Sequence, residues 1–166
     1  MKQVFVYLLL VMVLCGGGRL YAQGNKTTII LLRHAERDTT VKKDPPLTEV
    51  GKQRAERLKQ ALAAWRPDVL YSTATTRTMH TLMPLATQYN KQIQTYSAND
   101  QQGFAQLLKQ QAGKTVVVAG HSNTIPQLAN LLVGMDVYTD IPDNEFGRVW
   151  IITMADGVAS VVMKVY

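Results

Sequence analysis

Three short apolar runs, each followed by a longer stretch with helical features, constrain the fold of this chain more than any other feature. The runs are TTIILLR at 27–33, DVLYS at 68–72 and TVVVA at 115–119. Continuous apolar runs of this length are typical of parallel strands that are buried on both faces. The alternation of such strands with helices predicts one parallel sheet between two helical layers, a three-layer α/β/α sandwich.

The remaining elements follow from capping and turn signals. Thr48 and Asp100 are suitable helix N-caps, and Asp156-Gly157 is a hairpin turn signal between the apolar stretches 148–154 and 158–165. The sheet is therefore expected to be mostly parallel with a C-terminal hairpin. Helices are expected at about 48–65, 75–89, 100–111 and 122–133, and a short strand at about 92–96.

The first 23 residues have the layout of a secretory signal peptide. Lys2 gives a positive start, residues 4–14 form an apolar run, and Tyr21-Ala22-Gln23 resembles a cleavage region. The run is shorter than the roughly 20 residues that a membrane-spanning helix needs. We expect a single domain over residues 24–166, exported to the periplasm or secreted, with no stable membrane span in the mature chain.

Composition narrows the possible functions of that domain. Cys15 is the only cysteine and lies in the leader, which excludes disulfides and cysteine-ligated metals from the mature chain. Removal of Lys2 and Arg19 with the leader lowers the formal charge from +6 to +4. This mild excess suits an anionic substrate but also an ordinary soluble surface. No basic tract with interleaved aromatic residues is present, so nucleic-acid binding is not indicated.

Two histidines follow the two most apolar runs. His34 comes directly after Arg33, and His121 lies between Gly120 and Ser122. Ligands of open α/β sheets bind beyond the carboxyl ends of the strands, so both histidines are candidates for one site. Neither histidine belongs to a metal-ligand pattern, and no metal is predicted. The other histidine of the mature chain, His80, is interpreted as structural or peripheral.

The motifs around these histidines resemble the phosphoglycerate mutase-like branch of the histidine phosphatase superfamily. The resemblance covers residues 28 to about 132, with all elements in the family's order. It is carried by Arg33-His34-Ala35-Glu36, by Leu47-Thr48-Glu49-Val50-Gly51, by Tyr71-Ser72-Thr73 with Arg77, and by Gly120-His121-Ser122-Asn123-Thr124.

This resemblance implies a phosphatase that forms a covalent phosphohistidine on His34, without a cofactor. His121 would donate hydrogen bonds to the phosphoryl oxygens, and Arg33 and Arg77 would clamp them. Arginine suits this role because its planar fork binds two phosphate oxygens at once. Ser122 would add backbone N–H groups at the start of the following helix.

The chain departs from the family pattern at several positions. Ala35 replaces a glycine, and Arg37 and Thr40 stand where serine and asparagine are common. No glutamate lies between Arg77 and His121, where many members carry the general acid. The candidates for proton donation are Asp100, Asp38 and Glu36, and the choice among them stays open.

Several alternatives remain beside hydrolysis of phosphate monoesters. The chain could be a catalytically impaired module that binds phosphate or phosphosugars, or a phosphoglycerate mutase-type phosphotransferase. Removal of phosphate from phosphohistidine proteins or from envelope sugars is a narrower version of the phosphatase hypothesis. Ser122 as a nucleophile is rejected because the Gly-x-Ser-x-Gly pattern is incomplete. The acidic stretch 143–145 is interpreted as a solvated loop rather than a calcium site. The natural substrate and the oligomeric state are left open.

Overall fold

The computed structural model describes residues 26–166. The predicted signal peptide and its cleavage region lie outside these residues, as does the start of the predicted domain at residue 24. Between residues 26 and 166, no helix has the length and apolar character needed to cross a bilayer.

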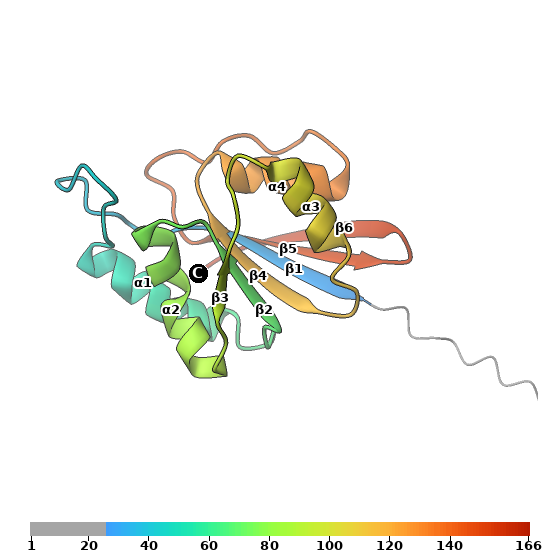
Figure 1. Cartoon of the computed structure of the whole chain (residues 1–166), viewed down its shortest axis with the longest axis horizontal. Helices are drawn as coiled ribbons and strands as arrows, with labels where there is room; N and C mark the ends of the chain where they lie inside the picture. The colour runs from blue at the N-terminus through green and yellow to red at the C-terminus, as the bar shows by residue number, and fades with distance from the viewer. Residues whose placement is uncertain (1–25) are drawn as a thin grey trace, which may run out of the picture.

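Six strands form one mixed sheet, in the order β3-β2-β4-β1-β5-β6 (Figure 1). The first four in this order are parallel. Strand β5 runs antiparallel to β1, and β6 pairs antiparallel with β5 to form a hairpin. The predicted mostly parallel sheet with a C-terminal hairpin is thus confirmed. The strands are β1 (Thr27–Arg33), β2 (Val69–Ser72), β3 (Ile93–Thr95), β4 (Thr115–Gly120), β5 (Arg148–Ala155) and β6 (Val158–Val165).

In the described part of the chain, four helices cover the two faces of this sheet (Figure 1). Alternate residues of β1 serve opposite layers: Ile30 packs in the core under α1 and α2, and Leu31 in the core under α3 and α4. This two-sided burial explains why the run is apolar throughout, and it confirms the three-layer prediction. The helices are α1 (Glu49–Ala61), α2 (Thr76–Tyr89), α3 (Gln101–Lys109) and α4 (Thr124–Val133).

The predicted caps are in place, but two helices are shorter than expected. The hydroxyl of Thr48 accepts from the amide of Gly51, and the carboxylate of Asp100 accepts from the amide of Gly103. Helix α1 ends at Ala61 rather than near Trp65, and α3 ends at Lys109 rather than Gln111. The error in α1 has a physical cause: Trp65 still packs against the core under α1 and α2, so its apolar character continued the helical pattern beyond the helix.

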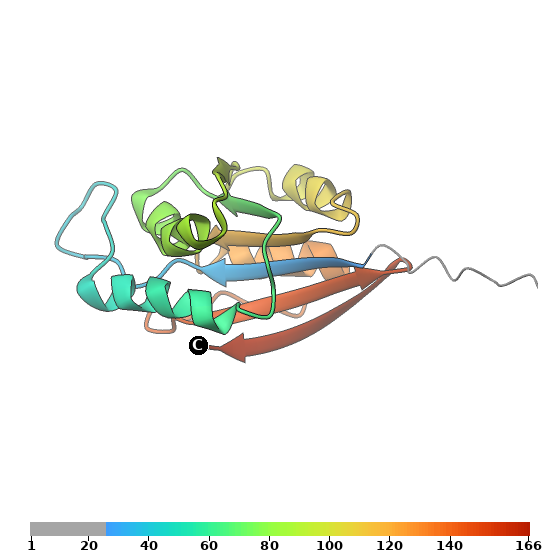
Figure 2. The ribbon, with the colours of Figure 1, turned by 90° about the horizontal axis from the view of Figure 1, so that it is seen from below.

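The β5–β6 hairpin brings the end of the chain back to α1 (Figure 2). Its turn places Asp156 and Gly157 at φ of 51° and 78°, the left-handed conformation that two-residue hairpin turns require. The guanidinium of Arg54 on α1 donates to the carbonyl oxygen of Tyr166 over 3.1 Å, which ties the last strand to the helical layer.

Candidate active site at the carboxyl ends of the strands

The carboxyl ends of β1, β2 and β4 meet at one edge of the sheet. Arg33 pairs with Gly120 in the β1–β4 ladder, and Ser72 pairs with Ala119 in the β2–β4 ladder. His34 and His121 are the residues that follow the ends of β1 and β4. The centroids of their imidazole rings lie 5.6 Å apart, so the structure brings the two histidines together as predicted.

His34 is 4% exposed and is held by the main chain. Its amide donates to the carbonyl oxygen of Gly120 over 3.0 Å, and its Nδ1 lies 2.7 Å from the carbonyl oxygen of Ala35. A carbonyl oxygen can only accept a hydrogen bond, so Nδ1 carries the proton of the neutral ring. The lone pair of Nε2 is therefore available for attack on an electrophile.

His121 has the opposite tautomer. The Nη2 atom of Arg77 lies 3.3 Å from Nδ1 of His121, and a guanidinium can only donate, so this Nδ1 is the acceptor. Nε2 of His121 therefore carries the proton, and it lies 3.0 Å from the hydroxyl of Thr73. The two rings thus differ in chemistry: one offers a free nitrogen at Nε2, and the other an N–H.

Both histidines are neutral at neutral pH. Burial, together with the positive charges of Arg77 and Arg33, lowers the pKa of His34 to about 3 and that of His121 to about 4. The hydrogen bond to Ala35 works in the opposite direction on His34, but burial outweighs it. A histidine can act as a nucleophile only in the neutral form, so the site keeps His34 in the required state.

Arg33 is buried beside His34, with its guanidinium fixed by the segment before β5. Its Nη1 donates to the carbonyl oxygens of Pro142 and Glu145 over 2.8 and 2.9 Å, and its Cζ lies 4.3 Å from the ring centroid of Phe146. Its Nη2 lies 3.5 Å from the carboxylate of Asp143. Nη1 is thus fully used by the protein, and only the edge formed by Nε and Nη2 is left to bind a phosphoryl group.

Arg77 comes from the first turn of α2 and lies half-buried next to His121. Burial is the main cause that lowers its pKa, and the charge of Arg37 adds to the effect, while Asp44 opposes it. A guanidinium remains charged at any working pH even so. Its Nε is buried without a partner among residues 26–166, which leaves a donor free for an anion.

Ser122 and His80 take different places relative to the two histidines. Ser122 follows His121 directly, and its carbonyl oxygen accepts from the amide of Ile141 over 2.9 Å, just before α4 begins. Its part in phosphate binding stays a prediction. His80 lies in an exposed groove between α1 and α2 that is also lined by Leu47 and Met83, away from the paired rings.

Each of the three carboxylates considered for proton donation has another bonding role. Glu36 accepts from Nε and Nη2 of Arg54 at 2.6–3.0 Å. Burial works to raise the pKa of Glu36, but the hydrogen bonds and charge of Arg54 outweigh it and hold the pKa below its usual value. Asp38 bonds to Thr40 at the surface, and Asp100 caps α3. No contact singles out one of them as the general acid.

Sequence reasoning missed one wall of the site, the segment Pro142–Phe146. Phe146 contacts Arg33, and its ring centroid lies 6.4 Å from that of His34. The interpretation of residues 143–145 as a solvated loop is right for the Asp143 side chain, which is 96% exposed, but the backbone of the same segment holds Arg33. No sequence motif marks this contact, because it joins residues more than a hundred positions apart.

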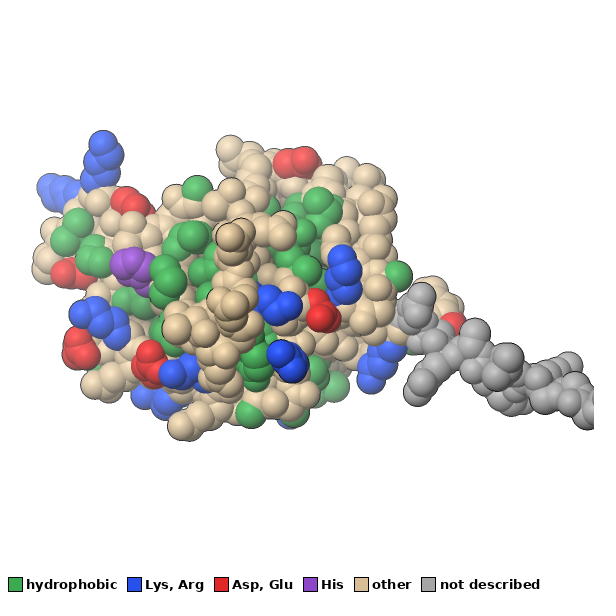
Figure 3. Space-filling view, turned by 60° about the horizontal axis from the view of Figure 1, so that its bottom comes forward, with side chains coloured by type: hydrophobic (Ala, Val, Ile, Leu, Met, Phe, Trp, Pro, Cys, Tyr) green, Lys and Arg blue, Asp and Glu red, His purple; other side chains and the backbone are tan. Residues whose placement is uncertain are grey.

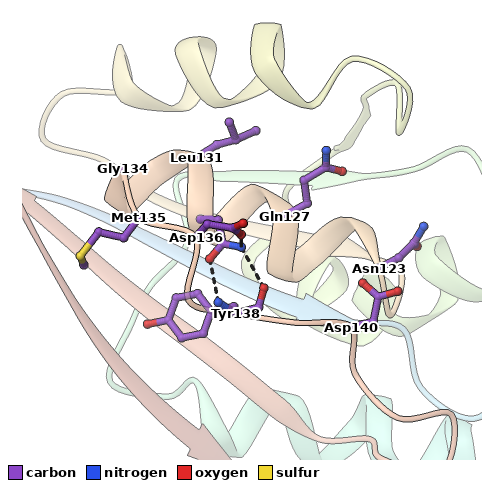
Figure 4. A pocket seen from close by; sticks show the side chains of 9 residues that line it. Asn123, Gln127, Leu131, Gly134, Met135, Asp136, Tyr138 and Asp140 are labelled. Atoms are coloured by element: carbon purple, nitrogen blue, oxygen red, sulfur yellow. Dashed lines mark hydrogen bonds between the residues drawn. The ribbon is translucent and has the colours of Figure 1, made fainter.

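The other surface features do not point to a different functional site. Within residues 26–166, no group of three or more His, Cys, Asp or Glu is placed to hold a metal ion. A hollow of about 700 Å³ lies along α4, with Asn123, Gln127 and Asp140 on its lining, but neither paired histidine lines it (Figure 4). Figure 3 shows basic and acidic side chains interspersed over one face, without a continuous basic patch there.

A family model described as histidine phosphatase superfamily (branch 1) matches residues 29–100, which include His34 and Arg77. The match confirms the predicted resemblance to this superfamily. The matched segment ends before His121, so the second histidine joins the site through the geometry of the fold rather than through this match. A search of curated proteins gave no match.

Several solved structures have the same fold as this chain. Phosphoserine phosphatase from Entamoeba histolytica, in complex with 3-phosphoglyceric acid, has a TM-score of 0.67 and 19% identity over 84% of this chain and 98% of its own. YhfR from Bacillus stearothermophilus has a TM-score of 0.66 and 20% identity over 83% and 96%. A mycobacterial glucosyl-3-phosphoglycerate phosphatase has a TM-score of 0.64 and 12% identity over 84% and 97%.

Proposed function

We propose that this protein hydrolyses phosphate monoesters through a covalent phosphohistidine on His34. The observation that carries the proposal is the pair of neutral imidazoles, one buried and one half-buried, which lie 5.6 Å apart with opposite tautomers. His34 has a free Nε2 to attack phosphorus, and His121 has an N–H to donate to a phosphoryl oxygen. The phosphatases among the structural relatives support a phosphatase activity at a general level.

The reaction runs in two steps. In the first, Nε2 of His34 forms a bond to phosphorus, the ester P–O bond breaks, and the leaving oxygen takes up a proton. Nδ1 keeps its proton and its bond to Ala35 throughout, so the ring does not turn. In the second step, water attacks phosphorus, the N–P bond breaks, and inorganic phosphate leaves as Nε2 regains its lone pair.

Arg33 and Arg77 stabilise the negative charge of the phosphoryl group. A transferring phosphoryl group spreads negative charge over its equatorial oxygens, so positioned cations and N–H donors supply most of the catalysis. The Nε and Nη2 edge of Arg33 and the unpartnered Nε of Arg77 are the donors available for this charge. No contact among the described residues favours a mutase or a non-catalytic binding module over hydrolysis. The signal-like leader suggests that the reaction takes place outside the cytoplasm.

The test is turnover of a generic aryl phosphate by the full chain, with His34→Ala beside the wild type. An aryl leaving group needs little protonation, so the reaction does not depend on a strong general acid. We expect release of phosphate by the wild type and a loss of at least about a thousandfold in His34→Ala. A denaturing quench at alkaline pH, which preserves phosphohistidine, followed by mass spectrometry should place the phosphoryl group on His34. Turnover that survives His34→Ala would overturn the proposal.

A further inference from the structure

A chain of hydroxyl groups connects His121 to the main chain of the β2–α2 turn. Nε2 of His121 lies 3.0 Å from Oγ1 of Thr73, which lies 3.0 Å from Oγ1 of Thr78. The hydroxyl of Thr78 in turn donates to the carbonyl oxygens of Thr73 or Thr75, each 2.9 Å away. Thr73 and Thr78 are both buried, so water does not substitute for these partners.

Both ends of this chain have a fixed direction. At one end the guanidinium of Arg77 can only donate, so Nδ1 of His121 accepts and Nε2 must donate. At the other end a carbonyl oxygen can only accept, so the hydroxyl of Thr78 must donate to it. The proton of the Thr73 hydroxyl therefore points to Thr78, and its lone pair faces Nε2–H of His121.

We propose that Thr73 is a positioning residue that fixes the proton of His121 on Nε2. This inference rests on the proposed function, in which His121 donates to a phosphoryl oxygen. If the proton of His121 moved to Nδ1, this N–H would face the N–H of Arg77, so two donors would oppose each other. Nε2 of His121 would then present a lone pair, rather than a proton, to the Thr73 hydroxyl and to the substrate. Thr73 prevents this by offering Nε2–H an acceptor while the site is empty.

The chain itself offers a matched set of variants. Thr73→Val keeps the shape of the side chain and removes the hydroxyl, whereas Thr73→Ser keeps the hydroxyl. Thr75→Val removes a neighbouring hydroxyl that contacts Thr78 over 2.8 Å but leaves every link from His121 to the carbonyl oxygens intact. Thermal unfolding of each variant would show that it is folded, and Thr73→Ala replaces Thr73→Val if the valine variant does not fold.

Two measurements test the role of Thr73. In ¹⁵N-labelled free protein, the nitrogen chemical shifts of His121 should show a single Nε2–H tautomer in the wild type, in Thr73→Ser and in Thr75→Val, and a mixture of tautomers in Thr73→Val. With an aryl phosphate, Thr73→Val should lower kcat about tenfold to thirtyfold with little change in KM, since a misplaced donor affects the transition state more than binding. Thr73→Ser should stay within about threefold of the wild type.

The inference is overturned if Thr73→Val keeps a single Nε2–H tautomer, or if Thr73→Ser is as impaired as Thr73→Val. The tautomer is read from the free protein, so it decides the role of Thr73 even if the wild type does not turn over phosphate esters. In that case the proposed function fails and the positioning of His121 stands on its own.

Discussion

The two histidines of the site are held in different ways. His34 is fixed by the main chain, with its ring bonded to Ala35 and its amide to Gly120. His121 is fixed by side chains from another part of the sequence, Thr73 and Arg77. Main-chain partners persist through most substitutions, whereas side-chain partners are lost with one. The position of the proposed nucleophile, His34, therefore depends on the main chain, whereas that of His121 depends on side chains that a single mutation can change.

Replacement of each histidine in turn should have the largest effects on turnover and should show whether the two rings have different roles. His34→Gln removes the nucleophile, and we expect turnover of an aryl phosphate to fall by at least about a thousandfold, with no phosphoenzyme. His121→Gln removes only a donor to the transition state, and we expect a loss of about a hundredfold with phosphoenzyme still formed. Single-turnover kinetics with mass spectrometry would separate the two. Equal losses without phosphoenzyme in either variant would contradict the assigned roles.

Low pH should destabilise the fold because His34 and His121 bind protons more readily in the unfolded chain than in the folded chain. In the folded chain the pKa values of His34 and His121 are lowered to about 3 and about 4. Between pH 6.5 and about 4, these two imidazoles therefore bind protons in the unfolded chain but not in the folded chain. Stability therefore falls as the pH falls through this window, by roughly 1.4 kcal/mol per pH unit for each histidine. Above pH 6.5 the two rings contribute no pH dependence.

Urea unfolding of the wild type and of His121→Gln at pH 7, 6 and 5 would measure this effect. The variant should lose about half of the slope contributed by the two rings. An unchanged slope would show that His121 is protonated equally in the folded and unfolded chains.

Thr81→Val should weaken the main-chain support of His34. The amide of Ala35 donates to the hydroxyl of Thr81 over 2.9 Å, and this amide is buried. Loss of the acceptor leaves a buried N–H unpaired, which we expect to cost about 1–3 kcal/mol in the free energy of unfolding. Chemical denaturation measures that cost. The ring of His34 keeps its own bond to Ala35, so the tautomer of His34 in ¹⁵N spectra should not change; a changed tautomer would show that side chains hold His34 as well.

Glu36→Gln should have the smallest effect on activity. The Glu36 carboxylate bonds to Arg54 rather than to either histidine, so it serves the attachment of α1 to the turn after β1. We expect turnover of an aryl phosphate within about threefold of the wild type and a loss of about 1 kcal/mol in stability, as for a partly exposed ion pair. A much larger loss of turnover on an alkyl phosphate than on the aryl phosphate would instead identify Glu36 as the proton donor.

The sequence predicted the strands and the meeting of the histidines better than the surroundings of the site. Burial on both faces made the centre of the run at Thr27–Arg33, residues 29–32, continuously apolar, and the predicted bounds of this strand were correct. The rule that ligands bind at strand ends then placed His34 and His121 in one site, and the family resemblance added Arg77. The contacts of Arg33 could not be predicted in this way, because Phe146 reaches it only through the tertiary path of the segment before β5.

The tautomers were also beyond sequence reasoning. They depend on which side of each ring meets a donor or an acceptor, and this follows from distances such as the 2.7 Å between Nδ1 of His34 and the carbonyl oxygen of Ala35. The general acid stayed unassigned for a similar reason. The sequence already predicted Asp100 as a helix N-cap, but only the hydrogen-bond partners of Glu36 and Asp38 show that these two carboxylates also have other roles.

His34 follows the end of β1, a strand with neighbours on both sides, and this position limits which parts of the site can vary in sequence. The proposed nucleophile directly follows β1, which is paired with β4 on one side and β5 on the other. The segments around it, residues 37–46 and 134–147, are loops with few regular bonds. If the proposed function holds, we expect that remodelling these loops would change the choice of substrate without displacing His34 from the end of its strand.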